Sequence, residues 1–295
     1  MRWPDSVTIV EVGPRDGLQD QQVILPTEAK LRFIQLLAAA GFRRIEATSF
    51  THPKWIPPLA DADALAAGLG AIHGPAGAIT WSALIPNQRG YDRAHAAGIH
   101  EVTLVVSASE SHNKANINRS VAESLAGFRE ITQHARRDGI RVRGAIATAF
   151  GCPFEGAVPP QQVIAIARAY GEMGVDELCL ADTIGSGQPR QVFELFEAAA
   201  AACPQIPLAA HFHDRRGYGL PNVLAALAAG ATVFDSSVGG LGGCPYAPGA
   251  PGNISTRAIV AFMADMGVKT GIDLDGVAAA EHQVLQMLRE TATPH

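Results

Sequence analysis

Eight short runs of β-forming residues recur along this chain, and stretches with helical periodicity separate them. The strand-like runs cover residues 7–13, 44–50, 79–85, 101–108, 142–150, 177–182, 208–214 and 232–238. The alanine-rich stretches 28–40, 161–173 and 221–229 lie between strand-like runs and carry apolar residues at helical spacing. Strands that alternate with helices predict a parallel sheet. Eight repeats, with no Gly-rich dinucleotide loop after the first strand, favour a closed (β/α)8 TIM barrel over an open doubly wound sheet.

A repeated corner supports this interpretation. Gly41, Gly98, Gly174 and Gly230 each follow a predicted helix and precede a predicted strand. We expect these glycines to adopt the left-handed conformation that ends a helix. No interdomain linker is visible, so we expect a single catalytic domain over residues 1–295, with the barrel at about 7–270 and an extra C-terminal helical segment at about 271–295.

Composition restricts the possible partners. The chain has 295 residues, a net charge of -5 and a pI near 6.0, which argue against a nucleic-acid or anionic-membrane partner. No apolar stretch reaches the length of a membrane span, and no leader peptide is recognisable. Four cysteines are too few for a disulfide framework and suit a reducing compartment. We therefore expect a cytoplasmic protein.

Polar residues gather where the predicted strands end, which is where such barrels place their active sites. The residues concerned are Arg15 and Asp16, then Glu46, Thr48 and Ser49, then Asp182, and finally His211 and His213. Glu46 ends an apolar run, and because a buried acid needs a partner, Arg15 is the natural one.

His211 and His213 are two residues apart on a predicted strand, so both side chains point to the same face. They either bind one metal ion or serve as exposed or packing histidines. Asp16 and Asn253 would add oxygen ligands, and a mixed nitrogen and oxygen set suits Mg²⁺ or Mn²⁺ at least as well as Zn²⁺. An amidohydrolase is less consistent with this pattern, since those enzymes carry H-x-H on the first strand.

Cys244 follows a run of glycines after the eighth strand and precedes Pro245. This loop is either a phosphate-binding loop, which is common after late barrel strands, or a mobile loop that delivers a thiol. We interpret Cys179, inside the sixth strand, as packing, and Cys152 as structural.

Several motifs together resemble the 3-hydroxy-3-methylglutaryl-CoA lyases. Five segments are similar to that family. They are Glu11-Val12-Gly13-Pro14-Arg15-Asp16-Gly17-Leu18-Gln19, Ile45-Glu46-Ala47-Thr48-Ser49-Phe50, Gly151-Cys152-Pro153-Phe154-Glu155-Gly156, Asp182-Thr183-Ile184-Gly185 and Gly240-Leu241-Gly242-Gly243-Cys244-Pro245-Tyr246-Ala247. The likeness extends from about Val7 to Asp273 with the motifs in family order, and the cysteine loop is the most specific of them.

The resemblance implies metal-dependent cleavage of 3-hydroxy-3-methylglutaryl-CoA to acetyl-CoA and acetoacetate. It implies metal binding by Asp16, His211, His213 and Asn253, and catalysis by Arg15 and Cys244 with support from Glu46 and Asp182. It places Asn113, Lys114 and Asn116, after the fourth strand, against the acyl-CoA, and we group Ser49 with them. Whether Cys244, Asp16 or His211 moves each proton stays open.

Other readings remain beside this one. One alternative is a lyase for a related 3-hydroxy-3-alkylglutaryl-CoA or citramalyl-type thioester. A second is a superfamily relative that condenses acetyl-CoA with a 2-oxo acid, and a third is a non-catalytic barrel. Cys244 argues against the condensing enzyme, which needs no thiol loop. After His213 the chain reads Asp214-Arg215-Arg216, which is more basic than the family pattern. This departure leaves open which acyl group the protein accepts. We also expect a homo-oligomer, a dimer, and a role in leucine degradation.

Overall fold

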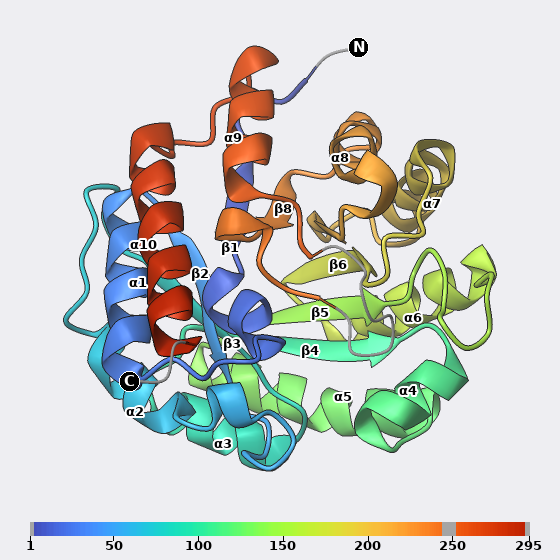
Figure 1. The fold of residues 1–295 in the computed structure, drawn as a ribbon. Helices are drawn as coiled ribbons and strands as arrows, with labels where there is room; N and C mark the ends of the chain where they lie inside the picture. The colour runs from blue at the N-terminus through green and yellow to red at the C-terminus, as the bar shows by residue number, and fades with distance from the viewer. Residues whose placement is uncertain (1–2, 244–251, 293–295) are drawn as a thin grey trace.

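The protein forms a closed barrel of parallel strands surrounded by helices. The computed structural model describes residues 3–243 and 252–292, and within them eight strands pair in chain order. The strands are β1 (Thr8–Glu11), β2 (Arg44–Ser49), β3 (Thr80–Leu84), β4 (Glu101–Ser107), β5 (Arg141–Ala147), β6 (Glu177–Asp182), β7 (Leu208–Phe212) and β8 (Val233–Ser236). β1 pairs with both β2 and β8, so the first and last strands close the ring (Figure 1). The predicted (β/α)8 barrel is confirmed.

Helices cover the outside of the barrel. They are α1 (Thr27–Ala39), α2 (Ala62–Leu69), α3 (Gln88–Ala96), α4 (Glu110–Ile117), α5 (Val121–Asp138), α6 (Pro160–Met173), α7 (Pro189–Ala202), α8 (Gly219–Ala228), α9 (Thr256–Asp265) and α10 (Leu274–Ala292). The expected C-terminal helix is α10, which packs beside α1 (Figure 1). The short α4, between β4 and α5, was not predicted. Within the described ranges, none of the helices combines the length and apolar composition needed to cross a membrane.

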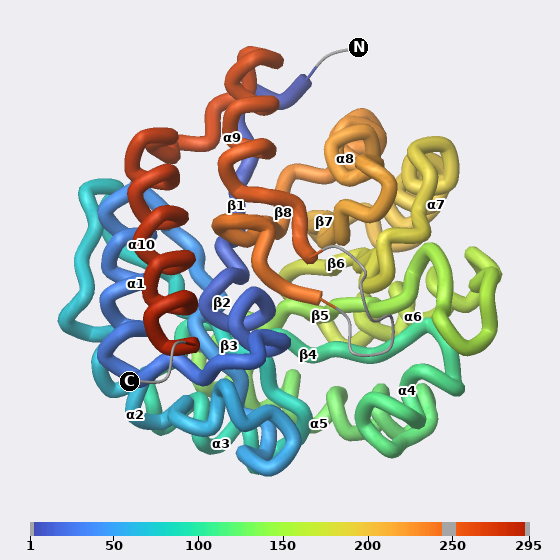
Figure 2. The backbone as a smooth tube through the Cα atoms, viewed as in Figure 1, coloured from blue at the N-terminus to red at the C-terminus, as the bar shows by residue number. Residues whose placement is uncertain are grey.

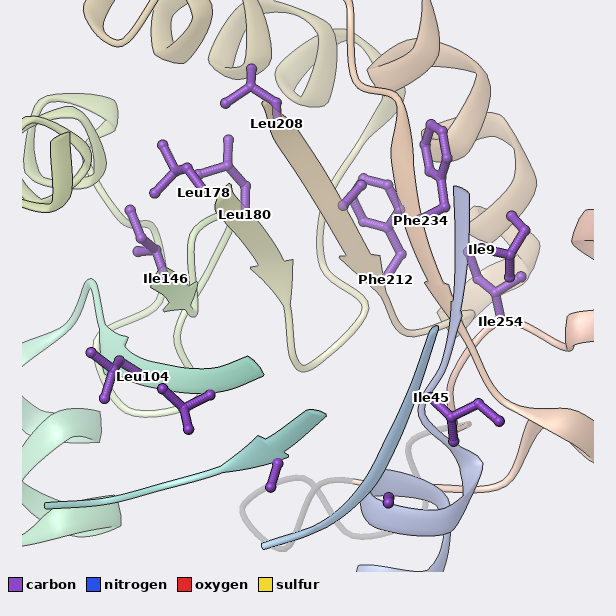
Figure 3. Close-up of a cluster of buried hydrophobic side chains, with 14 of the residues drawn as sticks. Ile9, Ile45, Leu104, Ile146, Leu178, Leu180, Leu208, Phe212, Phe234 and Ile254 are labelled. Atoms are coloured by element: carbon purple, nitrogen blue, oxygen red, sulfur yellow. The ribbon is translucent and has the colours of Figure 1, made fainter. Parts of the chain in front are cut away.

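Two apolar cores hold the layers together. The larger lies between the strands and the helices, and Figure 3 shows part of it, including Ile45, Leu104 and Phe234 on their strands. A smaller cluster lies inside the barrel and includes Val10, Val12 and Cys179. Alternate residues of one strand therefore serve the two cores, as the two-residue period of a strand requires.

The predicted glycine corners have the expected backbone. The φ angles are +96° at Gly41, +72° at Gly98, +76° at Gly174 and +96° at Gly230. Residues other than glycine rarely adopt a positive φ angle. A glycine at each position therefore lets the helix end and the chain turn into the next strand. The smooth backbone trace in Figure 2 shows the resulting succession of helix and strand around the ring.

Charged side chains also fill the barrel interior. At the N-terminal end of the strands, Arg44 donates to Glu101 at 2.7 Å and to Glu177 at 2.6 Å. Arg143 then lies between Glu177, 2.9 Å from its Nε, and Asp235, 2.8 Å from its Nη2. All five residues are buried, so each charge depends on these partners. This network, named here the axial ion network, leads from one end of the barrel toward the other.

Candidate active site

Arg15 and Asp16 lie in one π-helical turn, Gly13–Gly17, that follows β1 directly. The backbone N–H groups of Arg15, Asp16 and Gly17 all donate to the carbonyl of Val12, at 3.1, 2.7 and 3.1 Å. The predicted first strand extended to Gly13, and this turn shows that it ends earlier. Such turns are frequent at functional sites. Here the turn places two charged side chains at the barrel mouth, the end where the strands' carboxyl termini meet.

Asp16, His211 and His213 converge at the barrel mouth. Each offers one ligand atom, and these atoms lie within 4.8 Å of one another. Nε2 of His213 is 3.8 Å from Oδ2 of Asp16, and the two imidazole centroids are 5.3 Å apart. The two histidines, one on β7 and one directly after it, thus face the same side, as their two-residue spacing predicted, and three of the four predicted ligands meet.

Asn253, the fourth predicted ligand, lies against the same group. Its Nδ2 donates to Asp16 Oδ2 at 2.7 Å and to the Leu241 carbonyl at 3.0 Å. Its backbone forms a bridge with His213, which brings the segment before α9 to the end of β7. Its Oδ1 is buried and has no hydrogen-bond partner among the described residues. A buried oxygen without a partner is costly, and a cation would satisfy it.

The electrostatics of this cluster favour a cation. Burial by itself would raise the pKa of Asp16, but the charges of Arg15, His211 and His213 outweigh burial and hold that pKa well below its usual value. These charges therefore favour the carboxylate form of Asp16. Two imidazoles, a carboxylate and an amide oxygen, without a thiolate among the described residues, form a donor set that fits a divalent metal ion.

Arg15 is held from two sides and keeps the donors of Nη2 free of partners among the described residues. Its Nε donates to Glu46 Oε2 at 2.6 Å, and its Nη1 donates to Asp16 Oδ1. Its Nη2 has no partner among the described residues, and Glu46 Oε1 likewise has none. The predicted pairing of Arg15 with Glu46 is therefore present. The guanidinium is oriented rigidly and retains an N–H group for a ligand beside the metal-binding cluster.

Asp182 and Ser49 accept hydrogen bonds from the backbone of the loops that follow their own strands. One oxygen of Asp182 accepts from the Ser186 backbone at 2.9 Å and the other from the Gly187 backbone at 2.7 Å. Desolvation raises the pKa of this buried carboxyl, and these hydrogen bonds oppose that effect. Ser49 Oγ accepts from the Thr51 backbone N–H at 3.2 Å. Both residues therefore shape the loops at the barrel mouth, and the supporting catalytic role of Asp182 stays a prediction.

The predicted acyl-CoA residues divide into two groups. The Asn113 side chain is buried, since its Oδ1 accepts from the Ser107 backbone at 3.0 Å and its Nδ2 donates to Ser124 at 2.9 Å. Its groups are thus occupied within the protein. Lys114 and Asn116 on α4 are exposed. Of the residues predicted to contact the acyl-CoA from α4, these two are therefore the ones that a ligand can reach.

Cys244 lies outside the described residues. The other cysteines have structural surroundings, as predicted for two of them. Cys152 donates to Ser109 Oγ at 3.0 Å and accepts from two backbone N–H groups, which ties the loop after β5 to the start of α4. Cys179 is buried inside the barrel, and burial raises its thiol pKa, so it is a poor nucleophile.

Two buried acids near the site had no predicted role. Asp235 on β8 accepts from Arg143 and lies 3.1 Å from Nδ1 of His211. Burial would raise its pKa, but Arg143 and His211 lower it to about 2. The signal in the sequence was a charged residue inside an apolar strand, which must find a partner. The identity of that partner depends on how β5, β7 and β8 align.

Glu11 is the second such acid, and it joins three segments of the site. Its Oε1 accepts from the Gly13 backbone at 2.8 Å and the Val238 backbone at 3.0 Å, and its Oε2 accepts from Thr256 Oγ1 at 2.6 Å. These donors begin the Arg15 turn, the glycine-rich segment and α9. Burial raises the pKa of Glu11 to about 7, although the three hydrogen bonds act in the opposite direction.

We predict that Glu11→Ala lowers the free energy of unfolding by about 3 kcal/mol, because three buried donors lose their acceptor. Chemical denaturation measures this. Glu194→Ala is a matched control, since Glu194 has only an exposed ion pair with Arg190 within α7 and should leave the denaturation midpoint unchanged. Equal midpoints for the wild type and Glu11→Ala would contradict the assigned role.

Comparison with known proteins places this geometry in context. The model of the HMGL-like family matches residues 6–284. The hydroxymethylglutaryl-CoA lyase YngG of Bacillus subtilis is 47% identical over 280 residues, which cover 95% of this chain and 92% of that protein. The hydroxymethylglutaryl-CoA lyase of Pseudomonas mevalonii is 44% identical over 273 residues, covering 92% and 89%.

Solved structures agree with these sequence relatives. The crystal structure of the Bacillus subtilis HMG-CoA lyase superimposes with a TM-score of 0.93 at 45% identity, covering 98% of this chain and 96% of that one. The HMG-CoA lyase of Acinetobacter baumannii, in complex with coenzyme A and 3-methylmalate, gives a TM-score of 0.90 at 40% identity, covering 98% and 93%. The similarity thus spans the whole barrel and the segments that carry the site.

Proposed function

The chain belongs to the HMGL-like family, and on that premise we propose that it is a hydroxymethylglutaryl-CoA lyase, a carbon–carbon lyase that splits 3-hydroxy-3-methylglutaryl-CoA into acetyl-CoA and acetoacetate. The observation that carries the proposal is the convergence of Asp16, His211, His213 and the unsatisfied Asn253 oxygen beside the free N–H group of Arg15. High identity to lyases over nearly the whole chain supports the same conclusion.

The reaction makes defined demands on the site. A base removes the proton of the tertiary hydroxyl, the C2–C3 bond breaks, and its electron pair moves into the thioester as an enolate. C3 then becomes the ketone of acetoacetate, and an acid protonates C2 to give acetyl-CoA. Arg15 is suited to the charge that develops on the enolate oxygen, because donors aimed at such charge usually make the largest catalytic contribution. Cys244, Asp16 and His211 are the candidates for proton transfer.

Asp16, His211, His213 and Asn253 would hold the divalent cation. When bound, such an ion supplies Lewis-acid stabilisation of the substrate oxygens. We propose Mg²⁺ or Mn²⁺ rather than Zn²⁺, since half of the donor set is oxygen and none of the described cysteines belongs to it. Arg15, which Glu46 and Asp16 hold in place, would contact the substrate beside this cluster.

The remaining expectations are proposals of the same kind. Lys114 and Asn116, exposed on α4, are the proposed contacts to the acyl-CoA. Asn113 would hold the start of α4 for them, and Ser49 would order the loop after β2. A role in leucine degradation stays a prediction from the family resemblance. A cytoplasmic location stays a prediction from composition, and a dimeric state stays a prediction as well.

Product analysis tests the proposed activity. Incubation of the protein with 3-hydroxy-3-methylglutaryl-CoA and Mn²⁺ should release acetyl-CoA and acetoacetate in equal amounts. Cys244→Ala should lower that rate, whereas Cys179→Ala, which removes a buried thiol from the barrel interior, should not. Failure to release acetyl-CoA from this thioester or from any related one would refute the lyase assignment.

A panel of thioesters determines the acyl group. A citramalyl-type thioester belongs in it because the Acinetobacter relative was solved with coenzyme A and 3-methylmalate. Arg215 and Arg216 follow the metal-binding strand and are exposed at the barrel mouth, which is a second reason to include substrates with further anionic groups. A higher kcat/KM for one of these than for 3-hydroxy-3-methylglutaryl-CoA would reassign the substrate while keeping the reaction class.

A further inference from the structure

Asp235 lies between the axial ion network and the metal-binding cluster. It is on β8, faces the barrel interior and is 5% exposed. Its Oδ1 accepts from Arg143 Nη2 of β5 at 2.8 Å, and its Oδ2 lies 3.1 Å from His211 Nδ1 of β7. The two oxygens therefore have different partners, one on β5 and the other on β7.

These contacts determine which nitrogen of His211 carries the proton. A carboxylate accepts hydrogen bonds but donates none, so the Nδ1 that faces it must be protonated. A neutral imidazole with its proton on Nδ1 has its lone pair on Nε2. The Nε2 atom is then the one that can bind a cation together with Asp16 and His213. Carboxylates that orient metal-binding histidines in this way are common in metalloproteins.

Arg143 keeps Asp235 in the required form. A guanidinium has donors only and stays charged, so it requires an acceptor at Oδ1. On the other side of the guanidinium, Glu177 forms an ion pair 2.9 Å from Arg143 Nε, without the geometry of a hydrogen bond. The carboxylate of Asp235 is thereby fixed in both orientation and charge, and its second oxygen is directed to His211.

We propose that Asp235 is a positioning residue that holds His211 in the Nδ1–H tautomer and so presents Nε2 to the divalent cation. The inference rests on the proposed metal site and extends it to a residue outside the ligand set. Asp235 acts through His211 and does not touch the substrate in this account.

The substitution Asp235→Asn tests this proposal because its effect has a predictable sign. Arg143 has only donors, so the amide introduced at this position must turn its oxygen toward Arg143 and its NH₂ group toward His211. The NH₂ group donates, which requires Nδ1 of His211 to accept and moves the proton to Nε2. The side chain keeps its size, yet the lone pair needed by the metal is lost.

The tautomer is measured directly by ¹⁵N NMR of histidine-labelled, metal-free protein at about pH 9, where an ordinary imidazole is neutral. The His211 signals are assigned by their absence in His211→Gln. Wild-type His211 should have a protonated Nδ1 and an unprotonated Nε2, and Asp235→Asn should reverse the two. Calorimetric titration with Mn²⁺ should then give about 10- to 100-fold weaker binding for Asp235→Asn.

Glu177→Gln is the matched control, since it makes the same chemical change one link further along the network and leaves the Asp235–His211 contact in place. It should keep the wild-type tautomer and Mn²⁺ affinity, and thermal unfolding of both variants reports any common loss of stability. Protonated Nε2 in wild-type His211, or wild-type Mn²⁺ affinity in Asp235→Asn, would overturn the proposal. If the wild type bound no Mn²⁺, the proposed metal site would be refuted, but the NMR spectrum would still determine the tautomer of His211. The spectrum of the wild type alone determines it even if Asp235→Asn does not fold.

Discussion

Asp16→Asn should abolish measurable turnover, with a loss well beyond the roughly 10- to 100-fold typical of residues outside the ligand set. Asp16 is the only anionic member of the cluster with His211, His213 and Asn253, and it also pairs with Arg15. The substitution keeps the side-chain size but removes the charge that attracts a cation. It therefore weakens metal binding and releases Arg15 at the same time.

The measurement combines Mn²⁺ titration with kcat at saturating Mn²⁺. Exhaustive chelation of the wild type should also remove activity, and added Mn²⁺ or Mg²⁺ should restore it. Asp63→Asn is the control, because Asp63 forms only an exposed pair with Arg93 and should leave both quantities unchanged. Full activity of the chelated wild type, or Mn²⁺ binding by Asp16→Asn as tight as in the wild type, would show that this cluster is not the metal site.

Arg15→Lys should lower kcat by about 100- to 1,000-fold while changing Mn²⁺ affinity little. The guanidinium uses Nε for Glu46 and Nη1 for Asp16, and in the proposed reaction Nη2 would donate to the substrate. A lysine keeps the charge, but its single nitrogen cannot serve three directions in one plane. The loss should therefore appear in the chemical step, where charge develops on the enolate oxygen.

Single-turnover kinetics with 3-hydroxy-3-methylglutaryl-CoA separate that step from product release. Arg93→Lys makes the same substitution in an exposed ion pair and should keep the wild-type kcat. A near-normal kcat in Arg15→Lys would assign Arg15 to the scaffold of the turn after β1 and leave the enolate without an identified stabilising side chain.

The alternation of strands and helices predicted a parallel α/β sheet, and the count of eight repeats without a Gly-rich dinucleotide loop then favoured the barrel over an open sheet. The convergence of His211 and His213 followed from the two-residue period of a strand. Cross-barrel partners were not predictable, since Arg143 and Asp235 are 92 residues apart and meet only when the ring has closed. Local sequence likewise did not reveal that Asn113 faces inward on α4 whereas Lys114 faces solvent.

The axial ion network also constrains how the strands can assemble. Arg44, Arg143, Glu177 and Asp235 come from four different strands, and each has its partners inside the ring. A slip of one residue in β5 would turn Arg143 toward the helices and bring an apolar neighbour against Glu177, which would leave buried charges unpaired. Apolar contacts discriminate poorly between such arrangements, whereas ionic contacts discriminate strongly. Correct strand register is thus coupled to Arg143, the same arginine that orients Asp235. A barrel that closed in the wrong register would therefore also leave His211, a proposed metal ligand, without its orienting carboxylate.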